Sequence, residues 1–237
     1  MSAAPPLRGI RACVFDAYGT LFDFGSAVAR CRDALGDKAD RLTTLWRDKQ
    51  LQYTWLRSLQ HRHADFWHVT GDALDYALEA LAIDQPGLRD RLMQLYRELD
   101  VFPEVPDVLK RLKAAGFTTA ILSNGTPDML QSAIAHAGIG ALIDHVFSVE
   151  AVGIYKTAPP VYQLAVNRLG VAPAAVTFQS SNGWDVYAAS AFGFRTVWCN
   201  RTGQPRERLP GTPDHVIGTL VALPALLDVS RDENRDG

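Results

Sequence analysis

The chain has 237 residues, of which 47% are hydrophobic and 21% are charged, with a formal net charge of −2. This composition is typical of a soluble globular protein with one large or two modest domains. The near balance of charge excludes an extended basic face, so we expect neither nucleic acid nor a membrane as a partner. We expect a cytoplasmic protein, because no segment resembles a signal peptide or a membrane span. The spacing of Cys13, Cys31 and Cys199 indicates buried free thiols rather than disulfides or a zinc site.

The first apolar, β-rich run ends at Asp16, in the segment Val14-Phe15-Asp16-Ala17-Tyr18-Gly19-Thr20-Leu21-Phe22. A glycine-containing turn follows at once, which predicts a carboxylate at the carboxyl end of a buried strand, where open α/β sheets bind ligands. An Asp in that position can act as a covalent nucleophile, because an ester intermediate divides one difficult displacement into two easier steps. The alternative is that Asp16 only caps the turn.

Residues 26–99 have a helical pattern, with apolar residues three and four positions apart, as at Leu42, Leu45 and Trp46. No strand pattern interrupts this block. Thr70 is predicted to cap the start of one helix, and Pro86 is predicted to open another.

Beyond Pro103, strand and helix patterns alternate. Strands are predicted at residues 118–122, 146–149, 176–179 and 196–199, and helices at residues 106–116, 159–169 and 184–192. This alternation is typical of a parallel sheet flanked by helices. The sequence therefore predicts an α/β fold. Its doubly wound, mainly parallel Rossmann-like sheet core consists of residues 1–22 and 104–237, and residues 23–103 form an inserted α-helical cap.

Polar residues also follow the later predicted strands, at the sheet edge where such folds assemble their sites. The hydroxyl of Ser123 and the amide of Asn124 suit a substrate carboxylate or a leaving anion, although a turn that caps the next helix is an alternative. Lys156 is either a cation that keeps Asp16 ionised or an ordinary solvated lysine. The last polar group is Ser180-Ser181-Asn182-Gly183-Trp184-Asp185.

The segment around Asp16 resembles the nucleophile motif of the haloacid dehalogenase superfamily. Phosphatases of that superfamily carry a second Asp where this chain has Tyr18, and a metal-binding acid where this chain has Ser181; of the acids near residue 180, only Asp185 is retained. A hard divalent cation prefers several oxygen ligands that include carboxylates. A departing halide needs no proton, so the loss of both acids favours a halogenated substrate over a phosphate.

From about residue 11 to about residue 227, the chain resembles the L-2-haloacid dehalogenases, the hydrolytic type with a helical cap. The cap carries a matching segment, Leu45-Trp46-Arg47-Asp48-Lys49-Gln50-Leu51-Gln52-Tyr53-Thr54-Trp55-Leu56-Arg57. The resemblance implies hydrolysis of short L-2-haloalkanoic acids to D-2-hydroxyalkanoic acids, with inversion at C2, through an aspartyl ester at Asp16. It also implies a homodimer, with no metal and no organic cofactor. The alternative is a small-molecule phosphatase of the same superfamily.

By the same resemblance, Asp16 attacks C2, Arg47 and Asn124 stabilise the departing halide, and Ser123 holds the substrate carboxylate. The supporting polar residues are Thr20, Lys156, Tyr162, Ser180, Asn182 and Asp185, and the apolar wall of the pocket consists of Tyr18, Leu51, Phe66 and Trp184. Asp185, Lys156 or both activate the water of the second step. Asp48 stands where the family commonly has Gln, and we expect its carboxylate to engage Arg47 or to narrow the range of halides.

Overall fold

The computed structural model describes residues 6–229, and its core is a six-stranded sheet with the strand order β5-β4-β1-β6-β7-β8. The strands are β1 (Ala12–Phe15), β4 (Thr118–Ser123), β5 (His145–Ser148), β6 (Val176–Ser180), β7 (Arg195–Cys199) and β8 (His215–Ile217). Every neighbouring pair in this sheet is parallel. The predicted α/β fold class is therefore confirmed.

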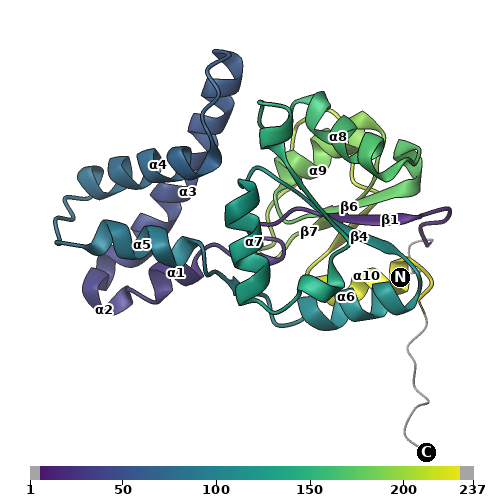
Figure 1. Cartoon of the computed structure of the whole chain (residues 1–237), viewed down its shortest axis with the longest axis horizontal. Coiled ribbons are helices and arrows are strands. Elements are labelled where there is room, and N and C mark those ends of the chain that lie inside the picture. Colours follow the sequence, from purple (N-terminus) through teal and green to yellow (C-terminus); the bar gives the residue numbers. More distant parts are fainter. Residues whose placement is uncertain (1–5, 230–237) are drawn as a thin grey trace, which may run out of the picture.

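Helices cover both faces of the sheet, with α8 and α9 on one side and α6 and α10 on the other (Figure 1). The core helices are α6 (Val105–Ala114), α7 (Pro127–His136), α8 (Pro159–Leu169), α9 (Gly183–Phe192) and α10 (Leu223–Leu226). The core also contains the 3-10 turns η2 (Gly140–Leu142), η3 (Val149–Ala151), η4 (Pro173–Ala175) and η5 (Leu220–Ala222), whereas η1 (Gly36–Lys38) lies between α2 (Arg32–Leu35) and α3 (Ala39–Leu59). A strand covered on both faces is buried along its whole length, as β1 is. This burial explains why the central strands are continuous apolar runs in the sequence.

A group of helices lies beside one end of the sheet (Figure 1): α1 (Ser26–Ala29), α2 (Arg32–Leu35), α3 (Ala39–Leu59), α4 (Phe66–Ala80) and α5 (Leu88–Tyr96). The chain enters and leaves this group through a two-stranded antiparallel ribbon of β2 (Phe22–Asp23) and β3 (Asp100–Val101). We propose that the helices between these two short strands are the cap. None of the helices in residues 6–229 is long and apolar enough to cross a membrane.

Two predicted helix starts in this region are wrong. The cap of α4 is Asp65, whose carboxylate accepts a hydrogen bond of 2.8 Å from His68 N. Thr70 lies inside that helix, and its hydroxyl donates back to the carbonyl of Phe66. Helix α5 starts at Leu88 with Gly87 as its N-cap, so Pro86 lies two residues before the helix.

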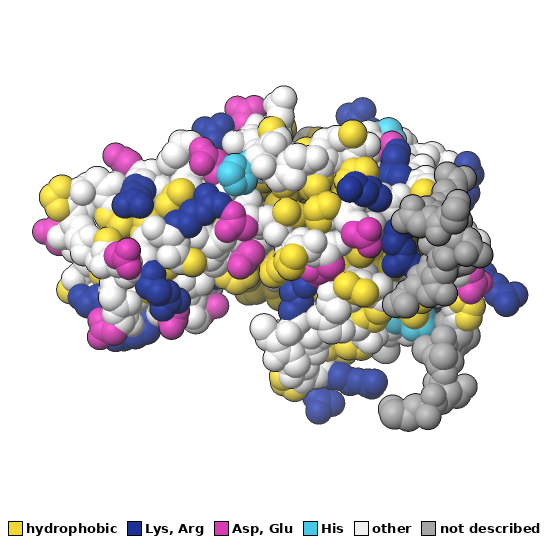
Figure 2. Space-filling view, turned by 90° about the horizontal axis from the view of Figure 1, so that it is seen from below, with side chains coloured by type: hydrophobic (Ala, Val, Ile, Leu, Met, Phe, Trp, Pro, Cys, Tyr) yellow, Lys and Arg dark blue, Asp and Glu magenta, His cyan; other side chains and the backbone are white. Residues whose placement is uncertain are grey.

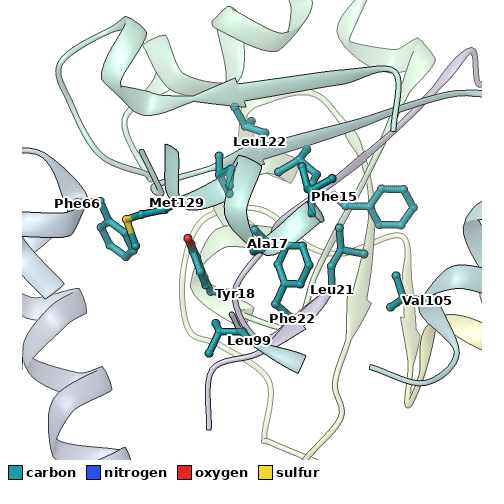
Figure 3. Close-up of a cluster of buried hydrophobic side chains, with 14 of the residues drawn as sticks. Phe15, Ala17, Tyr18, Leu21, Phe22, Phe66, Leu99, Val105, Leu122 and Met129 are labelled. Atoms are coloured by element: carbon teal, nitrogen blue, oxygen red, sulfur yellow. The ribbon is translucent and has the colours of Figure 1, made fainter. Parts of the chain in front are cut away.

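The cap and the core meet in an aromatic cluster centred on Tyr18. Its ring centroid lies 5.7 Å from that of Phe66 and 5.5 Å from that of Tyr96. Figure 3 shows Tyr18 beside Phe66, with Leu99 and Phe22 close by. The loop that follows Asp16 is therefore packed directly against the cap helices.

Candidate active site

Asp16 directly follows β1, at the carboxyl edge of the sheet, and is 5% exposed. Because β1 is flanked by β4 and β6, the residues that end those strands, Ser123 and Ser180, lie at the same edge. The turn after Asp16 passes through Gly19, which has φ +85° and lies so close to Ser181 that a Cβ atom would be 3.0 Å from its Oγ. A glycine therefore fits this turn on both conformational and steric grounds.

The two carboxylate oxygens of Asp16 are held differently. Oδ2 accepts hydrogen bonds from Thr20 Oγ1 (3.1 Å), Ser180 Oγ (3.0 Å) and Asn182 Nδ2 (2.8 Å). Oδ1 accepts from Lys156 Nζ at 2.9 Å. The carboxylate is thus oriented by three donors on one oxygen, and the other oxygen keeps a lone pair for attack.

Lys156 lies between two carboxylates. Its ammonium donates to Asp16 and, at 2.7 Å, to Asp185 Oδ2, and its side chain is 1% exposed. Asp185 is fully buried and also accepts from the hydroxyl of Tyr162 at 2.8 Å. Lys156 is therefore part of a buried ion network, and the alternative of a solvated lysine is wrong.

The charges in this network set the protonation states. Burial acts to raise the pKa of Asp16, but the charge and hydrogen bond of Lys156, together with the charge of Arg47 and the hydrogen bond from Ser180, outweigh it and lower that pKa. Burial acts to lower the pKa of Lys156, but the two carboxylates raise it. Burial, together with the charge of Asp16, raises the pKa of Asp185 to about 6 even though Lys156 opposes the shift. At neutral pH, Asp16 is thus ionised, Lys156 is protonated, and Asp185 is ionised but close to its titration range.

The donor set does not fit a divalent metal of the phosphatase type. In residues 6–229, no group of three or more His, Cys, Asp or Glu side chains is arranged to hold a metal ion. The Lys156 ammonium already balances the charge between Asp16 and Asp185. Ser181 Oγ, where the phosphatases have an acid, lies 3.3 Å from Thr20 Oγ1, within hydrogen-bond distance.

Arg47 reaches the site from α3. Its Nη2 lies 3.5 Å from Asn182 Oδ1, its Nη1 donates to Gln50 Oε1 at 2.7 Å, and its guanidinium carbon is 5.1 Å from the centre of the Phe24 ring. Asp48 is exposed and makes no ion pair with Arg47 in the described part of the chain, so the expected engagement is wrong. Consecutive helix residues point to different sides, which separates the two side chains.

Ser123 and Asn124 are both buried beside this network. Ser123 Oγ accepts from Gly125 N at 3.1 Å, which forms a turn, but α7 is capped by Thr126 instead. Asn124 Oδ1 accepts from Lys156 N at 3.0 Å. The turn at Ser123 is therefore present, and the prediction that it caps the helix is wrong.

The predicted apolar wall comes from both parts of the chain. Tyr18 and Phe66 are buried and in contact, and the Tyr18 hydroxyl has no hydrogen-bond partner among residues 6–229. The Trp184 ring lies 5.5 Å from that of Trp55 and lines a cavity of about 670 Å³. Leu51 is half-buried on α3, one turn beyond Arg47 and on the same side of that helix.

The sequence reasoning missed the residues that support Arg47, namely Gln50, Thr70 and Tyr96. The helical spacing could have indicated that Gln50 is buried, because it follows Leu42 and Trp46 at intervals of four residues, and all three are buried. A polar residue at a buried helix position needs hydrogen-bond partners.

Residues 10–193 match the family model of the haloacid dehalogenase-like hydrolases, and the chain is a member of that class. Over 219 residues it is 47% identical to (S)-2-haloacid dehalogenase 1 of Pseudomonas sp. (strain CBS-3), covering 92% of this chain and 96% of that one. It is also 47% identical to (S)-2-haloacid dehalogenase 4A of Burkholderia cepacia over 92% of this chain and 95% of that one. The solved structure of L-2-haloacid dehalogenase from Xanthobacter autotrophicus with chloropropionic acid covalently bound is 40% identical, with a TM-score of 0.86 over 92% of this chain and 98% of that one. Within its class, the chain belongs to the (S)-2-haloacid dehalogenase family.

Replacing Lys156 with Met tests the ion network. The change leaves Asp16 and Asp185 buried together without the cation that lies between them, so we expect a loss of about 3–5 kcal/mol in the free energy of unfolding at pH 8. Burial and mutual repulsion raise the pKa values of the pair in the folded variant above those in the unfolded chain. Protonation of the pair therefore stabilises the folded variant at low pH, and this stabilisation disappears as pH rises. The variant should accordingly be less destabilised relative to the wild type at pH 5 than at pH 8.

Urea unfolding at both pH values measures this effect. Lys113→Met is the matched control, because Lys113 pairs with Asp144 on the surface, where a loss of at most about 1 kcal/mol is expected. Equal losses in the two variants, or a Lys156→Met loss that does not change with pH, would contradict the assignment.

Proposed function

We propose that the protein hydrolyses short L-2-haloalkanoic acids to D-2-hydroxyalkanoic acids through a covalent ester at Asp16. The observation that carries the proposal is the orientation of Asp16, with three donors on Oδ2 and, among residues 6–229, only Lys156 on Oδ1. The guanidinium of Arg47 is linked to this carboxylate through Asn182. The activities for which the relatives are named and the covalent chloropropionic acid adduct of one of them support it.

In the first step, Asp16 Oδ1 attacks C2, the carbon–halogen bond breaks, and the configuration at C2 inverts. Arg47 stabilises the charge that develops on the halide, together with the Asn124 amide, whose oxygen is already bound to Lys156 N. Ser123 accepts from Gly125 N, which leaves its O–H to donate to the substrate carboxylate.

In the second step, water adds to the carboxyl carbon of Asp16, and negative charge develops on Oδ2. Thr20, Ser180 and Asn182 already donate to that oxygen and stabilise this charge. The bond from that carbon to Oδ1 then breaks, so Oδ1 leaves with the product and C2 is not inverted again. Asp185 accepts the proton of the water, and Lys156, 2.9 Å from Oδ1, protonates the departing alkoxide. The carboxylic acid that forms on Asp16 then returns a proton to Lys156, and Asp185 releases its proton to solvent, which restores the resting charges.

Asp185 is favoured over Lys156 as the base because Lys156 is held protonated between two carboxylates, whereas Asp185 is ionised above its pKa of about 6. Tyr162 orients the Asp185 carboxylate from its other oxygen. No step needs a metal or an organic cofactor. The phosphatase alternative is not favoured, because Tyr18 and Ser181 stand where that chemistry uses acids.

A halide-release assay on both enantiomers of 2-chloropropionate and 2-bromopropionate tests the reaction. We expect release from the L enantiomers only, D-lactate as the product, and the same rate with and without EDTA.

Asp16→Asn should lower turnover at least about 10³-fold, because an amide is a poor nucleophile, whereas Asp33→Asn on the surface should not change it. Chelator-sensitive release of phosphate from small phosphate esters, with no halide release, would support the phosphatase instead.

Replacing Asp185 with Asn should separate the two steps. We expect a burst of about one halide per active site followed by accumulation of the ester, detected by mass spectrometry on the peptide that contains Asp16. In the wild type, ester hydrolysis should slow about tenfold per pH unit below an inflection at or below about pH 6, because protonation removes the base. The inflection is not higher, since ester formation removes the Asp16 charge that raises the pKa of Asp185. An inflection above about pH 7 or a variant that releases halide without forming an adduct would exclude Asp185 as the base.

We infer that the protein is a homodimer that associates through the cap. At the end of α3, Leu59 is 77% exposed and Leu56 is 44% exposed, next to Trp55, which lines the cavity of about 670 Å³. In a two-fold dimer the same surface patch occurs on both subunits, so the exposed leucines of one protomer can pack into the apolar cavity of its partner. Light scattering should give twice the chain mass, and Leu59→Glu should give monomers. Val221→Glu, at another exposed apolar site in η5, should not. A monomeric wild type at micromolar concentration would refute the inference.

We also infer a cytoplasmic protein without a nucleic acid partner. Cys13, Cys31 and Cys199 are free and buried, as thiols are in reducing compartments. On the face seen in Figure 2, basic and acidic side chains are intermingled, whereas a nucleic acid surface gathers basic ones.

A further inference from the structure

A buried amide supports Arg47 from inside the cap. Gln50 is 1% exposed, and its Nε2 donates to Thr70 Oγ1 (2.7 Å) and to the Tyr96 hydroxyl (3.1 Å). Its Oε1 accepts from Arg47 Nη1 at 2.7 Å. The Thr70 hydroxyl donates its own proton to the Phe66 carbonyl, so toward Gln50 it acts as an acceptor. Thr70 therefore determines which end of the amide is the NH₂ group, and the oxygen faces Arg47.

This contact restricts the Arg47 guanidinium at one of its two terminal nitrogens. The group packs over the Phe24 ring at 5.1 Å, and its Nη2 lies 3.5 Å from Asn182 Oδ1, on the side of the nucleophile. A guanidinium has five N–H donors in one plane, and the bond to Gln50 uses one of them. The contact with Asn182 takes a second donor, and the others stay available for an anion.

For its effect on Arg47, the absence of a charge on the Gln50 side chain is as important as its position. A carboxylate at this distance would form an ion pair with Arg47 and compete with the halide for the same positive charge. An amide oxygen orients the guanidinium without neutralising it.

We propose that Gln50 is a positioning residue for the leaving-group step. It orients Arg47 toward the departing halide, and Thr70 and Tyr96 fix the amide from the other side. The role rests on the proposed function, because it requires Arg47 to stabilise the halide. Gln50 itself does not contact the reacting atoms.

Gln50→Met keeps the length of the side chain and removes its hydrogen bonds. We expect kcat to fall about 10- to 100-fold, since a small misplacement of a catalytic group has effects of that size. KM should change less than about threefold, because the charge on the halide develops only in the transition state. The loss should be larger for 2-chloropropionate than for the bromo acid, since chloride is the poorer leaving group.

Gln50→Glu should also be impaired, and Gln52→Met, on the exposed side of α3, should stay within about twofold of the wild type.

A double-mutant cycle with Arg47→Ala separates positioning from general damage to the fold. Without a guanidinium to orient, Gln50→Met should lower kcat less than about threefold further. If Gln50→Met does not fold, Tyr96→Phe removes one bond to the amide, keeps the ring, and enters the same cycle. Losses that multiply in the double variant, or equal losses for chloride and bromide, would overturn the role of Gln50 while leaving the proposed function intact. A wild type that releases no halide would instead refute the proposed function and this role with it.

Discussion

The contact on which the site depends is that of the Lys156 ammonium with the carboxylates of Asp16 and Asp185. Each buried ion costs several kcal/mol unless it is paired, and a lone buried carboxylate takes up a proton instead. A protonated Asp16 is not a nucleophile, so the cation is a condition for the chemistry as well as for stability. The sheet provides this arrangement, because β1 and β6 are neighbours, and the segments after β5 and β6 return to the same edge.

The core supplies the nucleophile and the cap supplies Arg47, so their relative position has to be fixed by other residues. Asn182 contacts both, since its Nδ2 donates to Asp16 and its Oδ1 lies near Arg47. Farther out, Glu150 of η3 accepts from Phe66 N at 3.2 Å and contacts His63 Nε2 at 2.9 Å, which holds the start of α4 against the core. The distance between Asp16 and Arg47 is thus set partly by packing remote from both.

The features that could be predicted from the sequence are those with a local cause. The central strands are buried on both faces and are therefore apolar runs, and Asp16 is an acid at the end of one of them. The local sequence predicts that Thr70 caps a helix, but its hydroxyl accepts a hydrogen bond from Gln50, which lies 20 positions earlier in the sequence. The short strands β2, β3 and β8 form only because a distant segment pairs with each, so no local pattern indicated them.

The charge balance explains why two acids of the phosphatase motif are absent. Arg47 and Lys156 are cations, Asp16 and Asp185 are anions, and the formal charge of these four groups is zero. Acids at the positions of Tyr18 and Ser181 would change it to −2, and without a divalent metal such a site repels a substrate that carries a carboxylate. Tyr18 instead packs against Phe66 and Tyr96, and Ser181 bonds to Thr20. Because the resting site is neutral, it can accept a monoanion, and in the proposed reaction the negative charge that leaves Asp16 on ester formation reappears on the halide beside Arg47.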